Sequence, residues 1–224
     1  MKLTESLPAV VPVYEDMLKR DRRWAMDEGD RQFQGDDAIF KTLRTIAGRL
    51  ESIGVPYAVA GGLALHAHGF RRLTVNVDIL VTREGLSALH AKLEGLGYVP
   101  PFAGSKNLRD AEYGVRVKFL VAGQFPGDGK PKPVAFPDPA EVGVEIKGMR
   151  YLSLPKLVEL KLASGMTGGV HRMRDFADVI ALIEAVRLSA DFADELNPCV
   201  REKYLEFWHG IKESPVGPVE PWPD

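Results

Sequence analysis

A glycine pair and two polar strand residues carry the chemistry that this sequence could perform. Gly61 and Gly62 follow a short apolar stretch, and Asn76 and Asp78 lie two residues apart in a later stretch of alternating residues. Because strand side chains alternate between faces, Asn76 and Asp78 share one face, opposite the apolar side chains. A glycine turn that opens a helix can bind a phosphate, and oxygen ligands on a neighbouring strand suit Mg²⁺. The stretch therefore predicts a site that presents a nucleotide phosphate to a divalent cation.

The same stretch resembles a known family. The pattern GG-x-A-x-x-x-HG-x-x-R-x-T, followed by the two polar strand positions, is similar to the opening signature of the polymerase-β-type nucleotidyltransferase superfamily. Within it, the pattern is most similar to the bacterial minimal and abortive-infection-toxin-like branch. The resemblance implies an NTP as substrate or ligand, bound in part by Gly61, Gly62, Arg72 and Thr74. The positions that fit the signature are Gly61, Gly62, Ala64, His68, Gly69, Arg72, Thr74 and Asp78.

Two positions depart from the metal-binding pattern of that family. The resemblance implies two carboxylates on the second strand and a third on a following strand, where residue 118 is the matching position. This sequence has Asn76 and Lys118 at two of the three positions, with Asp78 at the other. An amide oxygen can still bind Mg²⁺, whereas an ammonium ~4 Å from a dication is repelled by roughly 8 kcal/mol at an effective dielectric of 20. Asn76, Asp78 and Lys118 are the candidate catalytic residues, and Asn76 and Asp78 are the candidate Mg²⁺ ligands.

Two interpretations of these departures stay open. In the first, Lys118 points away, and Asp110, Glu112 or Glu145 completes an active, Mg²⁺-dependent transferase. Such an enzyme would place a nucleotide on a protein or RNA acceptor and, as a toxin-like protein, could have an antitoxin partner. In the second, Lys118 occupies the metal position and pairs with Asp78, and the fold binds an NTP or a protein partner without catalysis.

A second motif lies toward the C-terminus. SLPKLVELKLA predicts a helix that has Lys161 within its apolar arc, and R-x-R-D-F-x-D follows it. Together they resemble the C-terminal motifs of the toxin-like branch, in which a lysine and an aspartate, here Lys161 and Asp175, complete the nucleotide pocket. The alternative is that Lys161 only extends its stem over the core edge. Arg174 and Asp178, four residues apart on a helix, are expected to pair with each other.

The surrounding elements predict an α/β (α+β) fold, a nucleotidyltransferase-like mixed sheet flanked by helices. The expected helices span 36–53, 84–96, 153–163 and 172–186, with one more that starts at Asn197, and the expected strands span 57–60, 74–81, 115–122 and 142–146. This organisation gives a peripheral N-terminal segment (1–35), an α/β core (36–152), C-terminal helices packed on the core (153–212) and an extended tail (213–224).

Composition limits the classes of function. The chain has 224 residues, 45% apolar content and a net charge of −2, which suits a soluble globular protein without a global footprint for nucleic acid. The single cysteine, Cys199, excludes an intramolecular disulfide, so no disulfide partner is expected. Neither a secretory signal pattern nor a membrane-spanning apolar stretch is visible. We therefore expect a cytoplasmic protein without a membrane partner.

Overall fold

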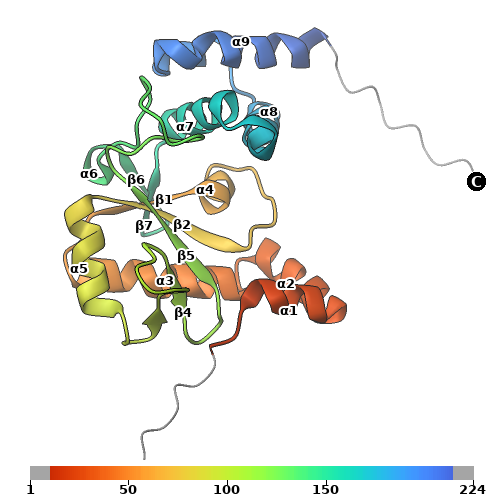
Figure 1. Cartoon of the computed structure of the whole chain (residues 1–224). Coiled ribbons are helices and arrows are strands. Elements are labelled where there is room, and N and C mark those ends of the chain that lie inside the picture. The colour runs from red at the N-terminus through yellow and green to blue at the C-terminus, as the bar shows by residue number, and fades with distance from the viewer. Residues whose placement is uncertain (1–10, 214–224) are drawn as a thin grey trace, which may run out of the picture.

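The computed structural model describes residues 11–213, and a seven-stranded mixed sheet lies at its centre (Figure 1). The strand order is β3-β4-β5-β2-β1-β7-β6. β1 is antiparallel to β2 and parallel to β7, and β2 is parallel to β5. The strands are β1 (Tyr57–Ala60), β2 (Asn76–Val81), β3 (Tyr98–Val99), β4 (Leu108–Asp110), β5 (Arg116–Val121), β6 (Gly143–Ile146) and β7 (Met149–Leu152). The predicted mixed sheet flanked by helices is confirmed.

Helices lie on both sides of this sheet. In Figure 1, α1, α2 and α3 lie at one end of the molecule and α7, α8 and α9 lie together at the other. The helices are α1 (Tyr14–Arg20), α2 (Arg22–Gln34), α3 (Ala38–Ser52), α4 (Gly61–Ala67), α5 (Arg83–Leu93), α6 (Pro139–Val142), α7 (Leu154–Thr167), α8 (Met173–Val186) and α9 (Pro198–Glu213). None of the helices in residues 11–213 has the length and apolar character needed to cross a membrane.

Alternation within the two central strands creates one apolar face and one polar face. Val77 and Ile79 of β2 are fully buried, and β5 aligns Val117 and Phe119 beside them. This face packs into the main core together with the apolar stripe of α3, which comprises Ile39, Leu43, Ile46 and Leu50. The opposite face of the same strands carries the polar side chains that the sequence singles out. The alternation therefore fixes which side of the sheet can hold a site.

Several expected boundaries are wrong: for example, the strand expected from residue 74 begins at Asn76, and the helix expected to end at 163 continues to Thr167. Two further shifts have clear local reasons. The helix expected over 84–96 ends at Leu93, because Gly95 takes a positive φ of 79°, and Leu96 is left 69% exposed. The strand expected from residue 142 begins at Gly143, because Asp138 accepts a hydrogen bond from the Ala140 amide and starts the short helix α6. Neither shift moves a residue of the polar face.

The segment predicted to be peripheral is packed against the core in the part that the structure describes. Tyr14 is 1% exposed and lies edge-on to Trp24 with ring centroids 5.6 Å apart. Gln32, at the end of α2, is buried and hydrogen-bonds to the backbone of Thr74. Dense charge along 14–31 hides this narrow, partly polar buried face in the sequence. The predicted tail over 214–224 and residues 1–10 lie outside the described residues.

Candidate functional site

A cavity of about 460 Å³ lies where the polar face of β2 and β5 meets α7 and α8. Asn76 and Asp78 line it from β2, Lys118 from β5, Lys161 from α7 and Asp175 from α8. Two motifs about a hundred residues apart in the sequence thus meet at one cavity, which has the size of a small-molecule site. Predicted or adjacent polar positions that also line it are Gly61, Arg72, Thr74, Arg174 and Asp178.

The glycine pair lies against the polar residues of the cavity. Gly61 has a positive φ of 61°, and a Cβ built on it would lie 2.2 Å from Oδ2 of Asp78. A Cβ on Gly62 would lie 2.9 Å from Cβ of Thr74. Both positions therefore need glycine so that α4 can start directly beside β2. This is a packing reason for the pair, and it stands beside the phosphate-binding role that the sequence predicts.

One group of charged side chains in the cavity forms ion pairs among its own members. Asp178 is 3% exposed and accepts from Nε and Nη2 of Arg72 at 2.6 and 2.9 Å, and from Nζ of Lys161 at 2.6 Å. Lys161 also donates to Asp175 at 3.1 Å, and the Ser164 hydroxyl donates to Asp175 at 2.7 Å. Burial alone raises the pKa of Asp178, but the Arg72 hydrogen bond and the Lys161 charge outweigh it, so the pKa is below its usual value. We call these five side chains the helix network.

The predicted pair between Arg174 and Asp178 is wrong. Asp178 points toward Arg72 and Lys161, while Arg174 is exposed at the edge of the cavity and forms no ion pair with any residue between 11 and 213. Two partners that are buried or half-buried bind a carboxylate more strongly than one exposed neighbour on the same helix. Arg174 is thereby left available at the cavity edge.

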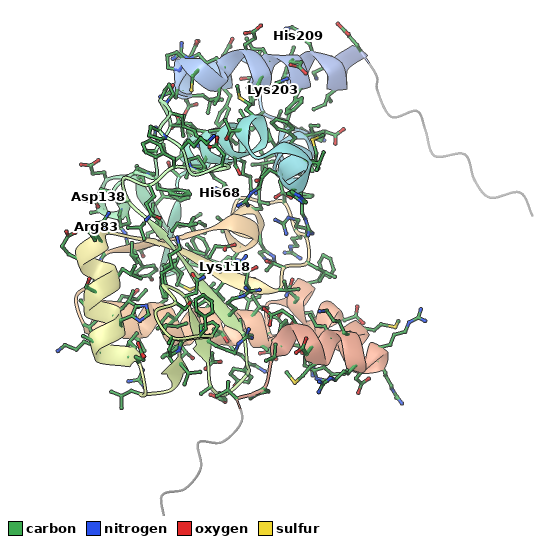
Figure 2. The ribbon with its side chains drawn as sticks, in the orientation of Figure 1. His68, Arg83, Lys118, Asp138, Lys203 and His209 are labelled. Carbon is green, nitrogen blue, oxygen red and sulfur yellow. The ribbon has the colours of Figure 1, made fainter. Side chains whose placement is uncertain are left out.

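A second group of polar side chains, on β2 and β5, has no direct ion pair between its members. Lys118 lies directly opposite Asp78 in the parallel pairing of β5 with β2, and Figure 2 shows it near the centre of the molecule. The ion pair between Lys118 and Asp78, one of the two alternatives from the sequence, is not formed, and the Lys118 side chain hydrogen-bonds to none of the described residues. Asn76 is 9% exposed, and its Nδ2 makes no hydrogen bond of normal length in the described part of the chain, although the amide lies close enough to the Asp78 carboxylate to lower its pKa. We call Asn76, Asp78 and Lys118 the strand trio.

The carboxyl group of the strand trio is perturbed in the opposite direction to Asp178. Burial raises the pKa of Asp78 above its usual value, although the Lys118 charge, the Asn76 amide, and the charges of Lys161 and Arg72 all lower it. Arg72 and Lys161 are already paired with Asp178, which limits what they contribute to Asp78. The two carboxylates of one cavity therefore have opposite electrostatic environments.

The donor set does not fit the divalent cation that the family resemblance implies. Within residues 11–213, no three His, Cys, Asp or Glu side chains gather in a way that could hold a metal ion. Asp110 instead accepts from the Thr42 hydroxyl at 3.0 Å, and Glu112 and Glu145 are exposed and do not line the cavity. Asp78 is left as a single carboxylate beside an ammonium group. The interpretation in which another carboxylate completes the metal site has no support in this geometry.

The cavity carries an excess of positive charge. Five cationic side chains line it against three carboxylates, which gives a net charge of +2 with His171 neutral; the cations are Arg72, Lys118, Lys161, Arg172 and Arg174. The same cavity is also lined by the apolar side chains of Phe136, Leu157 and Leu160, which we call the apolar wall. An anionic group next to an apolar group is the ligand chemistry that matches this lining.

Two residues that the sequence did not single out support the cavity. Gln32 donates from Nε2 to the Thr74 carbonyl at 2.9 Å and accepts from the Thr74 amide at 2.6 Å, as a neighbouring strand would. The same Nε2 lies 2.6 Å from Oδ2 of Asp37, the residue that caps α3. Ser164 positions Asp175. No local pattern marks Gln32 or Ser164, because their partners are set by the tertiary fold.

Comparison with known proteins gives similar structures but no similar sequences. No protein-family model matches the chain, and no curated protein matches it. A solved structure of the antibiotic-resistance factor ANT(2'')-Ia with adenylyl-2''-tobramycin is 14% identical, with a TM-score of 0.47 over 75% of this chain and 99% of that one. An antigenic nucleotidyltransferase-like protein from Paracoccidioides brasiliensis is 15% identical, with a TM-score of 0.45 over 78% of this chain and 88% of that one. At these values the likeness does not by itself assign a function.

Proposed function

We propose that this chain binds a nucleoside triphosphate in the cavity between the sheet and α7–α8, and that it does so without metal-dependent nucleotidyl transfer. The observation that carries the proposal is the net charge of +2 in a cavity where Lys118 and Arg174 form no ion pair with a described residue. A polyphosphate supplies the missing negative charge, and the apolar wall suits a base or sugar.

Transfer chemistry lacks its central requirement here. Nucleotidyl transfer uses two divalent cations about 3.5–4 Å apart, one of which activates the attacking hydroxyl. The strand trio offers one carboxylate, one amide and one ammonium group, and the two carboxylates of the helix network are occupied by Arg72 and Lys161. A protein or RNA acceptor and an antitoxin partner stay predictions from the sequence.

The test is thermal unfolding in a chelator with each of the four NTPs, compared with the matching nucleosides. A ligand at 100 times its Kd adds about 2.7 kcal/mol to the unfolding free energy. For a domain of this size that corresponds to a rise in Tm of roughly 5–10 °C. We expect this rise with at least one NTP and not with its nucleoside, because the phosphates make the contacts.

Two arginine variants separate binding at the cavity from a general effect of charge. Arg174→Ala removes a cation at the cavity edge, whereas Arg83→Ala removes an exposed cation of α5, far from Lys118 in Figure 2. The NTP-dependent rise should shrink in the first variant and persist in the second. No rise with any NTP, or an equal rise with the nucleoside, would overturn the proposal.

A further inference from the structure

We infer that Asn76 and Lys118 form a donor pair that holds a phosphate group directly, at the place where the related metal-dependent pattern would have an ion. The inference deepens the proposed function by naming the atoms that receive the phosphate, and it rests on that function only for the identity of the whole ligand. It applies equally to a free pyrophosphate and to the phosphates of a nucleotide. The donors are Nδ2 of Asn76 and Nζ of Lys118.

The Asn76 amide is the first support. Only two buried side-chain polar atoms lack a hydrogen-bond partner in the described chain, Asn76 Nδ2 and the Tyr98 hydroxyl, and only Asn76 lines the cavity. Buried donors are almost always paired in native proteins, and an amide NH₂ group has two hydrogens, so Nδ2 can take an acceptor from the cavity even with the Asp78 carboxylate nearby. A phosphate oxygen is an acceptor without a hydrogen, which matches an amide NH₂ group.

The Lys118 ammonium is the second, independent support. Lys118 is half-buried in the interior, yet it has no ion-pair partner in the described part of the chain. Asp78 lies directly opposite Lys118 in the parallel pairing of β2 with β5, and it shares a face of β2 with Asn76. Asp78 is close enough for the Lys118 charge to lower its pKa but forms no direct ion pair with it, so a ligand that supplies negative charge would stabilise this ammonium group further. The donor pair therefore offers a positive charge and a neutral donor on adjacent strands.

The other cations of the cavity cannot take this role as readily. Arg72 and Lys161 are held by Asp178 at 2.6 Å each, and Lys161 also contacts Asp175. Breaking these bonds to reach a ligand would leave buried carboxylates unpaired. Arg172 and Arg174 are exposed at the cavity edge. Lys118 is thus the interior cation whose charge is not already matched.

Direct binding by an ammonium group reverses the expected effect of Mg²⁺. In a metal-dependent site the cation bridges the protein and the phosphate, so Mg²⁺ strengthens binding. Here Mg²⁺ on the polyphosphate would lie beside Lys118 and be repelled by it, and it would also neutralise the oxygens that the donor pair needs. We therefore expect sodium pyrophosphate to bind in a chelator and to bind more weakly when Mg²⁺ is added.

The test is isothermal titration calorimetry with sodium pyrophosphate on the full chain, in a chelator and then in Mg²⁺. Lys118→Met and Asn76→Asp should each lower the affinity at least tenfold, because one removes the charge and the other replaces a donor with an anion. Lys118→Arg should retain most of it, and Lys92→Met, an exposed lysine of α5, should leave it unchanged. Unfolding temperatures of all variants check that each still folds.

The outcomes separate this inference from the proposed function. Pyrophosphate binding that requires Mg²⁺, or that survives Lys118→Met unchanged, overturns the donor pair, while NTP binding would still support the proposed function. Pyrophosphate binding that depends on both residues supports the donor pair, even if no NTP binds more tightly than pyrophosphate. Absence of binding by either ligand overturns both.

A gain-of-metal variant tests the position itself. Asn76→Asp combined with Lys118→Asp places three carboxylates on neighbouring positions of β2 and β5. We expect this double variant to bind Mn²⁺, detected by electron paramagnetic resonance of the bound ion, and to lose pyrophosphate binding in a chelator. Unchanged Mn²⁺ affinity would contradict the placement of the donor pair at a potential metal position.

Discussion

The helix network and the strand trio line one cavity and differ in how their charges are matched. In the helix network, Asp178, Arg72, Lys161 and Asp175 are joined by ion pairs of 2.6 to 3.1 Å. In the strand trio, Lys118 has no ion pair with a described residue, and a buried donor of Asn76 has no described acceptor. Matched charges hold parts of a protein together, whereas unmatched charges at a cavity are available to a ligand. The difference indicates which group is structural and which can bind.

The structure assigns different roles to the cavity cations than their residue types suggest. Arg72 and Lys161 are predicted nucleotide ligands, yet in the structure each is held by a buried carboxylate. Arg72 thereby joins the segment before β2 to α8, and Lys161 joins α7 to α8. Lys118, which the sequence marks as an obstacle to a metal, is the unmatched cation. Proximity to a cavity does not assign a role, because the partners of each charge decide it.

The largest expected effect comes from opening the helix network. Asp178→Ala leaves the half-buried Arg72 and the buried Lys161 without their shared carboxylate, and removing one partner of a buried ion pair costs about 3–5 kcal/mol. The free energy of unfolding, measured by urea denaturation, should fall by that amount. Asp194→Ala, at an 85% exposed aspartate, is the matched control and should change it by less than about 0.5 kcal/mol. A small loss in Asp178→Ala would show that the network does not join these elements.

The next effect concerns the contact between the glycine turn and the strand trio. Gly61→Ala should destabilise the chain by about 1–3 kcal/mol, because φ is positive there and the new Cβ would collide with the Asp78 carboxylate. Combining it with Asp78→Ala removes the carboxylate oxygen from the collision and should recover part of the loss. A double-mutant cycle of urea denaturation measures this coupling. Strict additivity of the two changes would contradict the close packing of Gly61 on Asp78.

Local sequence patterns predict much of this arrangement, and long-range partners explain the rest. Strand alternation puts Asn76 and Asp78 on one face, and Asp37 accepts from the Phe40 amide at the start of α3, as an aspartate before an apolar helical stripe commonly does. The partners of Asp178 could not be read in this way. Arg72 is 106 residues away in the sequence, and the nearby Arg174 looked like the natural partner. Periodicity assigns a residue to a face but does not say which residue of another element will meet it.

The same limit applies to the N-terminal helices. Gln32 bonds to Thr74 across 42 residues and supports the segment that leads into the strand trio. Its neighbours in the sequence, Arg31 and Phe33, are exposed, so nothing local distinguishes Gln32 from a solvated helix face. A single buried polar side chain carries too little apolar signal to mark a packed helix. The position of the predicted residues around one cavity is therefore clear from the structure, whereas their binding roles stay predictions.

The two carboxylates should respond to pH in opposite ways. The pKa of Asp178 is lowered by folding, so its stabilising effect is present at neutral pH and is lost as the pH falls through that lowered pKa. The pKa of Asp78 is raised by folding, so ionised Asp78 destabilises the fold at neutral pH; the cost shrinks as the pH falls below the raised pKa and is gone below the ordinary carboxyl pKa.

Urea denaturation of Asp178→Asn and Asp78→Asn as a function of pH measures this contrast. Asp178→Asn should be less stable than the wild type at pH 7, and the gap should close only below the ordinary carboxyl pKa of about 3.8. Asp78→Asn should be at least as stable as the wild type at pH 7, and its gap should close at a higher pH. Gaps of the same sign for the two variants would remove the electrostatic distinction between the groups.

The smallest expected change in the unfolding free energy is that of Lys118→Met, and it tests most directly whether the strand trio differs from the helix network. Lys118→Met keeps a long flexible side chain and removes an ammonium group that has no described partner, so no ion pair is broken. The free energy of unfolding should stay within about 0.5 kcal/mol of the wild-type value, because the Lys118 charge acts on Asp78 without a direct ion pair. Lys161→Met, which leaves Asp175 and Asp178 short of a buried partner, should lose several times more. If the two lysine variants were equally destabilised, Lys118 would have a structural partner, and its availability to a phosphate would no longer follow.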